Sequence, residues 1–279
     1  MSCKIDCHTH IVNEAIKAVY FDHTDGYALV MPFLEKFAGN APPDHSADIV
    51  QSDARLFLCP AIDISRDIPT QLATIEPCLE SHRVVGLKIY LTYQTGRADD
   101  ERLRCVYEFA EKHRLSITYH TGSCSLVLPT DNDINGSNAR YVQNVARQFP
   151  SVNFIVAHMD DPRYEACIRI VHEQPNMFTD FSGAYEPGTQ EGADMRWAID
   201  TFARAIHQYP DTYTSILYGT DFCPPINLSA IDEYDTTIAG IFKPEQFEDI
   251  YYHNALRAFP RLAEYIQKED VYDKAKTEF

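Results

Sequence analysis

Two histidines near the start of the chain have the chemistry and the spacing of metal ligands. The stretch D-C-H-T-H (residues 6–10) places His8 and His10 two positions apart. Residues i and i+2 of a β-strand project to the same side, so both imidazoles could bind one ion. The polar end of an ordinary strand has the same pattern, so the pair alone leaves both interpretations open. Asp6, one step deeper on that face, is expected to support the histidines or Lys88.

Three further candidate ligands follow apolar stretches. His120 ends SITYH, His158 ends NFIVAH, and Asp221 closely follows SILYG. Strict alternation puts His158 on the face of Phe154 and Val156. Alone, each histidine could be a hydrogen-bonded core residue and Asp221 a turn or helix cap. Three imidazoles and one carboxylate at one rim are typical of a Zn²⁺ site that leaves a position open for water.

A lysine occupies a comparable place in VVGLKIY. Leu87 and Ile89 share an aliphatic face that suits packing against helices, so Lys88 should project from the opposite face with Tyr90. The ordinary interpretation is a buried ion-pair partner of an aspartate.

The candidate residues follow strands of a repeating architecture. Short apolar stretches rich in Val, Ile, Phe and Tyr alternate with segments of helical periodicity. They predict strands over 3–8, 27–32, 55–62, 84–91, 116–120, 153–158, 177–182 and 215–219. Helices are predicted over 99–114, 138–149, 191–209, 231–241 and 244–259. Eight such units predict an α/β protein: one (β/α)8 TIM barrel domain over 1–279, with its chemistry at the carboxyl ends of the strands.

Composition excludes several classes of partner. The formal net charge is −17 and no run of Lys or Arg is present, which argues against nucleic-acid binding. Eight cysteines without a C-x-x-C pair predict buried thiols in a reducing compartment. Neither a signal peptide nor a long apolar run is evident, so we expect a cytoplasmic protein without a membrane segment. Assembly into a homo-oligomer is left open.

The ordered set of motifs resembles the amidohydrolase superfamily, specifically amidohydrolase family 2. The resemblance runs nearly end to end, through DCHTH, VVGLKIY, SITYHTG, NFIVAHMDD, MFTDFSG, LYGTDFCP and HNALRAF. It implies a divalent metal bound by His8, His10, His120 and Asp221, with zinc ahead of Mn, Fe or Ni. His158 would act beside the ion as acid, base or electrophile.

The resemblance also implies an alternative with two ions. Lys88 would then be carboxylated by CO₂ and bridge the ions, and His158 would bind the second one. We favour one ion.

The function implied is a metal-dependent hydrolase of a small molecule. The ion activates water against an amide, lactone or ester, and Asp221 carries the proton to the leaving group. A decarboxylase or hydratase (a lyase) acting on a carboxylated small acid is the alternative, followed by a catalytically silent metal- or ligand-binding barrel. Tyr90, Tyr93 and Tyr185 are predicted substrate contacts, and Arg163 is predicted to pair with an anionic substrate.

Overall fold

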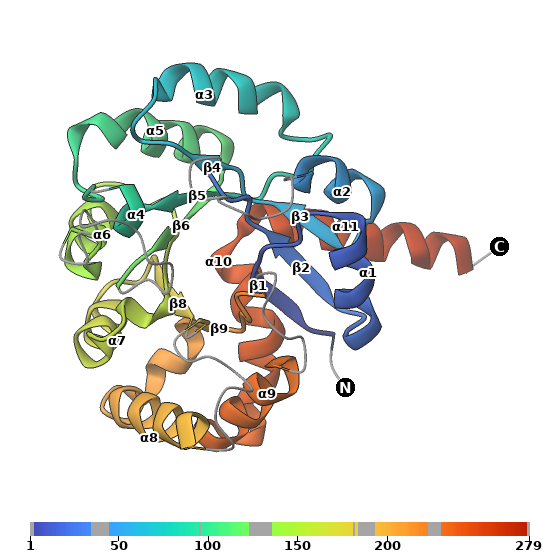
Figure 1. The fold of residues 1–279 in the computed structure, drawn as a ribbon. Coiled ribbons are helices and arrows are strands. Elements are labelled where there is room, and N and C mark those ends of the chain that lie inside the picture. Colours follow the sequence, from blue (N-terminus) through green and yellow to red (C-terminus); the bar gives the residue numbers. More distant parts are fainter. Residues whose placement is uncertain are drawn as a thin grey trace.

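Short parallel strands form the centre of the molecule (Figure 1). The computed structural model describes residues 3–34, 45–94, 96–122, 136–180, 182–183, 193–222 and 230–277. The strands are β1 (Ile5–Thr9), β2 (Tyr27–Val30), β3 (Leu56–Leu58), β4 (Ala61–Ile62), β5 (Gly86–Tyr90), β6 (Ser116–His120), β7 (Phe154–Ala157), β8 (Met177–Asp180) and β9 (Ile216–Leu217). Neighbours pair in sequence order, and every pairing is parallel.

The predicted third strand, 55–62, is divided into β3 and β4. Residues 59 and 60 lie between them, and Pro60 has no backbone N–H to donate to a neighbouring strand. The sheet continues across the gap because Val85 N donates to Leu58 O at 3.0 Å and Lys88 N to Pro60 O at 2.8 Å. β3 and β4 therefore occupy one position of the barrel.

The first and last strands meet and close the barrel. Thr9 and Phe222 form a parallel bridge. His10 N donates to Phe222 O at 2.7 Å, and Asp221 N donates to His8 O at 2.8 Å. We call this contact the closing seam. The predicted (β/α)8 barrel is confirmed; a domain extending over all of 1–279 stays a prediction.

Helices follow the strands and surround them. They are α1 (Glu14–His23), α2 (Ser46–Ser52), α3 (Ile68–Ile75), α4 (Leu91–Gln94), α5 (Arg104–His113), α6 (Ala139–Ala146), α7 (Tyr164–Glu173), α8 (Ala193–His207), α9 (Ala230–Ile241), α10 (Asn254–Ala258) and α11 (Pro260–Thr277). Short 3₁₀-helices cover Glu76–Cys78, Glu101–Leu103, Pro210–Ser215 and Pro244–Gln246, His158–Asp160 is a left-handed turn, and Asp249–His253 is a π-helix. The predicted helix over 244–259 is thus three short helical pieces. Among the described helices, none is long and apolar enough to cross a membrane.

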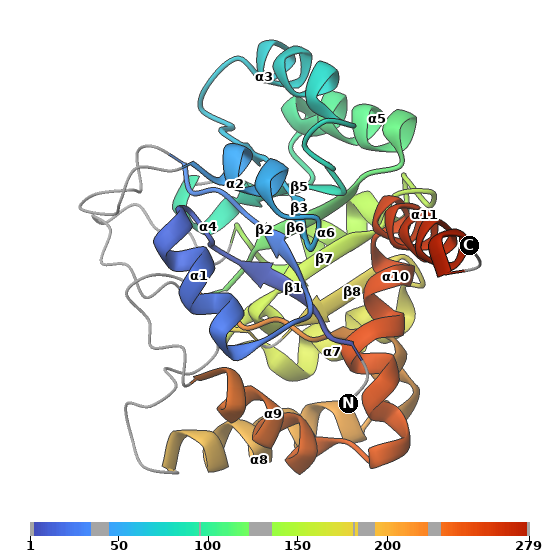
Figure 2. The ribbon, with the colours of Figure 1, turned by 90° about the vertical axis from the view of Figure 1, so that its right-hand side faces the viewer.

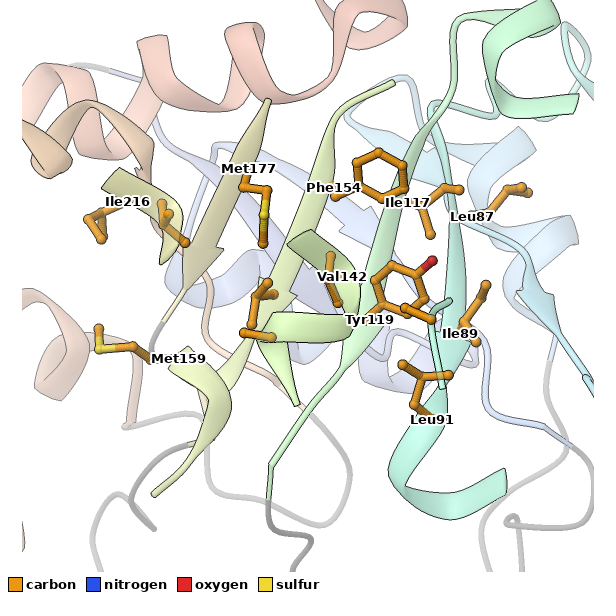
Figure 3. Close-up of a cluster of buried hydrophobic side chains, with 14 of the residues drawn as sticks. Leu87, Ile89, Leu91, Ile117, Tyr119, Val142, Phe154, Met159, Met177 and Ile216 are labelled. Carbon is orange, nitrogen blue, oxygen red and sulfur yellow. The ribbon is translucent and has the colours of Figure 1, made fainter. Parts of the chain in front are cut away.

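An apolar layer separates the strands from these helices. Ile117 and Tyr119 of β6 and Phe154 of β7 belong to it, and Val142 reaches it from α6 (Figure 3). The alternate residues of the strands point into the barrel, as β-strand geometry requires.

A second apolar cluster fills the barrel interior at the amino-terminal ends of the strands. Ala258 O of α10 accepts hydrogen bonds from Ser116 Oγ at 2.6 Å and Asn153 Nδ2 at 3.1 Å, at the starts of β6 and β7. α10 and α11 therefore close this end, and they lie together in Figure 2. The cluster comprises Ile5, Cys7, Leu29, Met31, Phe57, Cys59, Val85, Ile155, Phe178, Leu217, Ala255, Ala258, Phe259, Leu262 and Ile266. The polar interior residues are left at the opposite, carboxyl end.

Candidate metal centre

An irregularity in β1 aims the first histidine into the barrel. Asp6 pairs with Ala28 of β2, but Thr9 pairs with Val30, so β1 uses one residue more than β2 over this stretch. Such a bulge breaks the alternation of side chains. Cys7 lies in the interior cluster, and His8 also points inward, where its Nε2 lies 2.9 Å from Lys88 Nζ of β5.

Asp6 lies on the outer side of β1. One carboxylate oxygen accepts from His8 N at 3.1 Å and Thr220 N at 3.0 Å. The other accepts from Tyr20 of α1 at 3.0 Å and from the Thr220 hydroxyl at 2.7 Å. The expectation that Asp6 shares the face of His8 is wrong because the bulge intervenes. Asp6 instead holds the backbone of both strands at the closing seam, and its expected support of the metal ligands stays a prediction.

His8, His10 and Asp221 bring three ligand atoms together. Asp221 Oδ1 lies 3.0 Å from His10 Nε2 and 3.3 Å from His8 Nε2. Bonds from Zn²⁺ to such atoms are about 2.0–2.2 Å long, so two ligands of one tetrahedral ion are separated by about 3.3–3.6 Å. The 3.3 Å separation fits that spacing, and the 3.0 Å separation is slightly shorter. Burial would raise the pKa of Asp221, but the His8 charge and the His10 hydrogen bond hold it well below its usual range.

The surroundings of His10 add a second test of fit. Its Nδ1 lies 2.7 Å from Met31 O. A carbonyl oxygen only accepts, so Nδ1 carries the proton. Nε2 then faces the Asp221 carboxylate, which also only accepts when ionised, and either a second proton or a cation must balance the pair. A divalent cation fits this donor set.

His158 reaches the carboxyl end of the barrel through a left-handed turn. Phe154 and Val156 belong to the outer layer, and Ile155 belongs to the interior cluster. The prediction that His158 shares a face with Phe154 and Val156 is therefore wrong. Its φ of 63° turns the side chain back over the interior, and Met159 and Asp160 are also left-handed.

His120, at the end of β6, contacts His158. Its Nδ1 lies 2.9 Å from His158 Nε2, and the Tyr93 ring is centred 4.6 Å from its own. Within the described residues, it is not part of the group formed by His8, His10 and Asp221. The structure therefore brings the predicted ligands together as a triad, with His120 beside His158.

Lys88 is a buried cation next to the triad. Burial lowers its pKa to about 8, although the charges of Asp221 and Asp180 oppose this shift. Its Nζ lies 2.9 Å from His8 Nε2. The ordinary interpretation, an ion-pair partner of an aspartate, is not seen among the described residues: Asp221 and Asp180 act on Lys88 through their charges, and its close contact is with His8.

Asp180 and Ser182 belong to the site but were absent from the predicted residues. Asp180 Oδ2 lies 3.4 Å from His8 Nδ1, and Ser182 O lies 2.6 Å from His158 Nδ1. Burial raises the pKa of Asp180, but hydrogen bonding and charge from His8 outweigh it and lower the pKa to about 2. Asp180 ends β8, but the predicted strand over 177–182 ends at Ser182, so the strand-end criterion would have pointed to Ser182 and not to Asp180. Atoms of His8, His158 and Asp180 form a second group within 4.8 Å.

Aromatic side chains line one side of the centre. The Phe33 ring stacks on His10 with centroids 4.1 Å apart. Tyr90 stacks with His120 at 6.3 Å, and its hydroxyl donates to Pro32 O at 2.8 Å. Together with Tyr93 these residues form what we call the aromatic wall.

The other two predicted substrate contacts are Arg163 and Tyr185. Arg163 pairs with Asp160 through two contacts, Nη2 to Oδ1 at 2.6 Å and Nε to Oδ2 at 3.0 Å. This pairing commits its guanidinium to the turn after β7. Tyr185 lies outside the described residues.

Comparisons with known proteins agree with this architecture. The sequence profile of the family described as "Amidohydrolase" matches residues 5–261. No curated protein matches the chain in sequence.

Solved structures also resemble the chain. A 2,6-dihydroxybenzoate decarboxylase from Rhizobium has a TM-score of 0.62 and 15% identity over 93% of this chain and 99% of that chain. A 4-oxalomesaconate hydratase from Rhodopseudomonas palustris has 0.63 and 16% over 93% and 84%. An amidohydrolase from Burkholderia multivorans has 0.64 and 11% over 92% and 99%. At these identities the likeness shows the fold alone.

Proposed function

We propose that His8, His10 and Asp221 hold a catalytic metal, because the chain belongs to the amidohydrolase family. The superfamily that contains this family consists of metal-dependent enzymes that act on small molecules. The observation that carries this proposal is the convergence of two imidazole nitrogens on one carboxylate oxygen at 3.0 and 3.3 Å. His120 is proposed as the fourth ligand. Zinc is the ion that we favour, because it suits imidazole and carboxylate donors.

The reaction that we propose first is hydrolysis of an amide, lactone or ester. A bound divalent cation would supply an activated water and polarise the carbonyl group. In this reaction Asp221 would accept a proton from the attacking water and return it to the leaving group. His158 Nδ1 lies 2.6 Å from Ser182 O and therefore carries a proton, which leaves Nε2 to accept or donate one at the reacting side. Lys88 Nζ, buried beside His8, offers a positive charge to a developing anion.

The aromatic wall supports a second candidate, decarboxylation or hydration of a small unsaturated acid. Phe33, Tyr90 and Tyr93 surround His10 and His120 with flat apolar faces, against which a planar substrate could stack. Lys88 could balance the charge of a carboxylate near the centre. Structures of a decarboxylase and a hydratase that share the fold make this candidate worth testing beside hydrolysis.

One screen with a separate readout for each reaction tests both candidates. The purified protein, loaded with Zn²⁺, is incubated with lactones, esters and amides and with aromatic and unsaturated carboxylic acids, including 2,6-dihydroxybenzoate. Acid release measured with a pH indicator reports hydrolysis of lactones and esters, released amine measured with an amine-reactive dye reports hydrolysis of amides, and captured CO₂ reports decarboxylation. Hydration is followed by loss of the conjugated chromophore. The activity should disappear with a chelator and with Asp221→Asn. A protein that binds no divalent ion and turns over neither panel would contradict the proposal.

A further inference from the structure

We propose that Asp180 is a positioning residue that, with Ser182, fixes the tautomer of His8 and the backbone at His158. This inference rests on the proposed function in so far as it treats His8 as a ligand. It assigns to the end of β8 a role that neither the motif pattern nor the triad requires.

The contacts of Asp180 link two strands that carry site histidines. Its Oδ1 accepts from His158 N at 2.9 Å, from Ser182 N at 3.1 Å and from Ser182 Oγ at 2.6 Å. Its Oδ2 lies 3.4 Å from His8 Nδ1. The carboxylate is fully buried, so these groups, rather than solvent, are its surroundings.

The geometry determines which nitrogen of His8 carries the proton. Ser182 Oγ gives its own hydrogen to Asp180 and lies 3.1 Å from His8 Nδ1, which makes it an acceptor there. Both oxygens near Nδ1 therefore accept, and Nδ1 must carry the proton. The lone pair of His8 is then on Nε2, the atom that faces Asp221 Oδ1 at 3.3 Å. A carboxylate behind an imidazole also makes its other nitrogen a better metal ligand.

The same carboxylate holds the turn that places His158. A φ of 63° is unfavourable for a residue with a Cβ, so the turn needs partners. Asp180 Oδ1 takes the backbone N–H of His158, and Ser182 O takes the proton on its Nδ1 at 2.6 Å. One residue thereby sets the orientation of two imidazoles.

A direct role of Asp180 as a ligand is the competing interpretation, since His8, His158 and Asp180 form a compact group. Oδ1, however, already accepts three hydrogen bonds, and Oδ2 is directed at the protonated nitrogen of His8. These contacts favour positioning over ligation.

Asp180→Asn tests the inference while keeping the size of the side chain. The three donors at Oδ1 select the amide oxygen for that place, so the amide nitrogen faces His8 Nδ1. The amide nitrogen cannot accept the Nδ1 proton, so the fraction of His8 that carries its proton on Nδ1 should fall. A proton on Nε2 would have Asp221 Oδ1 as its acceptor at 3.3 Å, and Lys88 Nζ at 2.9 Å would oppose a complete change of tautomer. We expect ¹⁵N NMR of the metal-free protein to show this change, and Zn²⁺ affinity to fall by about 10–100-fold. At saturation the variant should still bind the wild-type number of ions.

Asp63→Asn is the matched control. Asp63 follows β4, is buried, and accepts from Ser65 N at 2.9 Å and Gln94 Nε2 at 2.8 Å, so its replacement should leave His8 unchanged. Ser182→Ala removes one acceptor of His8 Nδ1 and serves if the asparagine variant does not fold. It should weaken Zn²⁺ binding and shift the tautomer ratio by less.

Several outcomes would overturn the inference. An unchanged tautomer and unchanged affinity in Asp180→Asn would do so, and loss of one bound ion would show that Asp180 is itself a ligand. A wild-type protein that binds no Zn²⁺ would contradict the proposed function instead, and the tautomer measurement would still decide the role of Asp180.

Discussion

Gly183 is a position where one added methyl group should disturb the centre without removing a ligand. The residue has a φ of 61°, and its N–H donates to the Tyr234 hydroxyl at 2.8 Å. A Cβ built on it would lie 2.6 Å from Asp221 Oδ2 and 3.1 Å from His158 Nδ1. Gly183→Ala should therefore displace the Asp221 carboxylate.

The structure gives the size of this effect. Ordinary contact begins at 3.4 Å, so Oδ2 must move by about 0.8 Å (3.4 minus 2.6), and a misplacement near 1 Å can lower a reaction rate by about 100-fold. The left-handed backbone adds a cost of roughly 1–2 kcal/mol for a residue with a Cβ. Such a cost corresponds to a Tm lower by about 2–8 °C in a chain of this size class. The fold should survive, and the centre should not function normally.

Zn²⁺ affinity, measured by competition with a chromophoric chelator, and turnover on any substrate found by the screen are the two assays. Gly219→Ala is the control: its Cβ would lie 3.2 Å from His8 Cβ and 3.6 Å from Asp180 Cβ, without touching a carboxylate oxygen. We expect a clearly smaller loss there. Wild-type affinity and turnover in Gly183→Ala, or equal losses in both variants, would refute the placement of Asp221.

Four other substitutions separate the roles of the proposed centre. His8→Ala and His10→Ala should each abolish stoichiometric zinc, measured by elemental analysis, with the far-ultraviolet circular dichroism retained; a full equivalent of zinc would remove these residues from the ligand set. Asp221→Asn should keep part of the metal but lower kcat by about 10²–10⁴-fold, the usual contribution of a proton-transfer group, and near-normal kcat would exclude that role. Lys88→Met should keep one bound ion at undiminished affinity, because the ammonium 2.9 Å from His8 Nε2 opposes a cation. Loss of an ion from this variant would instead indicate a two-metal centre bridged by carboxylated Lys88.

The strand pattern predicted the barrel because it depends on features that are local in sequence. β6 has the predicted bounds, 116–120, and His120 and Lys88 project inward as alternation requires. The break at Pro60 was not expected, although proline chemistry explains it, because the apolar residues continue on both sides of it.

Alternation failed where the backbone departs from a regular strand. The bulge in β1 separates Asp6 from His8, and the left-handed turn at residue 158 reverses the side of the strand from which His158 projects. Both departures are stabilised by contacts with distant residues: Asp6 with Thr220, and His158 with Asp180. Sequence-local periodicity contains no information about such partners. His158 does point into the barrel as predicted, but the left-handed turn directs it there and alternation along the strand does not.

The closing seam implies that the proposed metal centre is completed only when the last strand joins the first during folding. His10 and Asp221 are 211 residues apart, yet their side chains meet across the bridge between Thr9 and Phe222. A chain that has not yet joined its last strand to its first has no complete donor set, so an ion can select only the closed barrel. Bound metal would then stabilise the contact between the first and last strands. It would slow hydrogen exchange at the backbone N–H groups of His10 and Asp221, and loss of the ion would favour opening of the barrel along this edge.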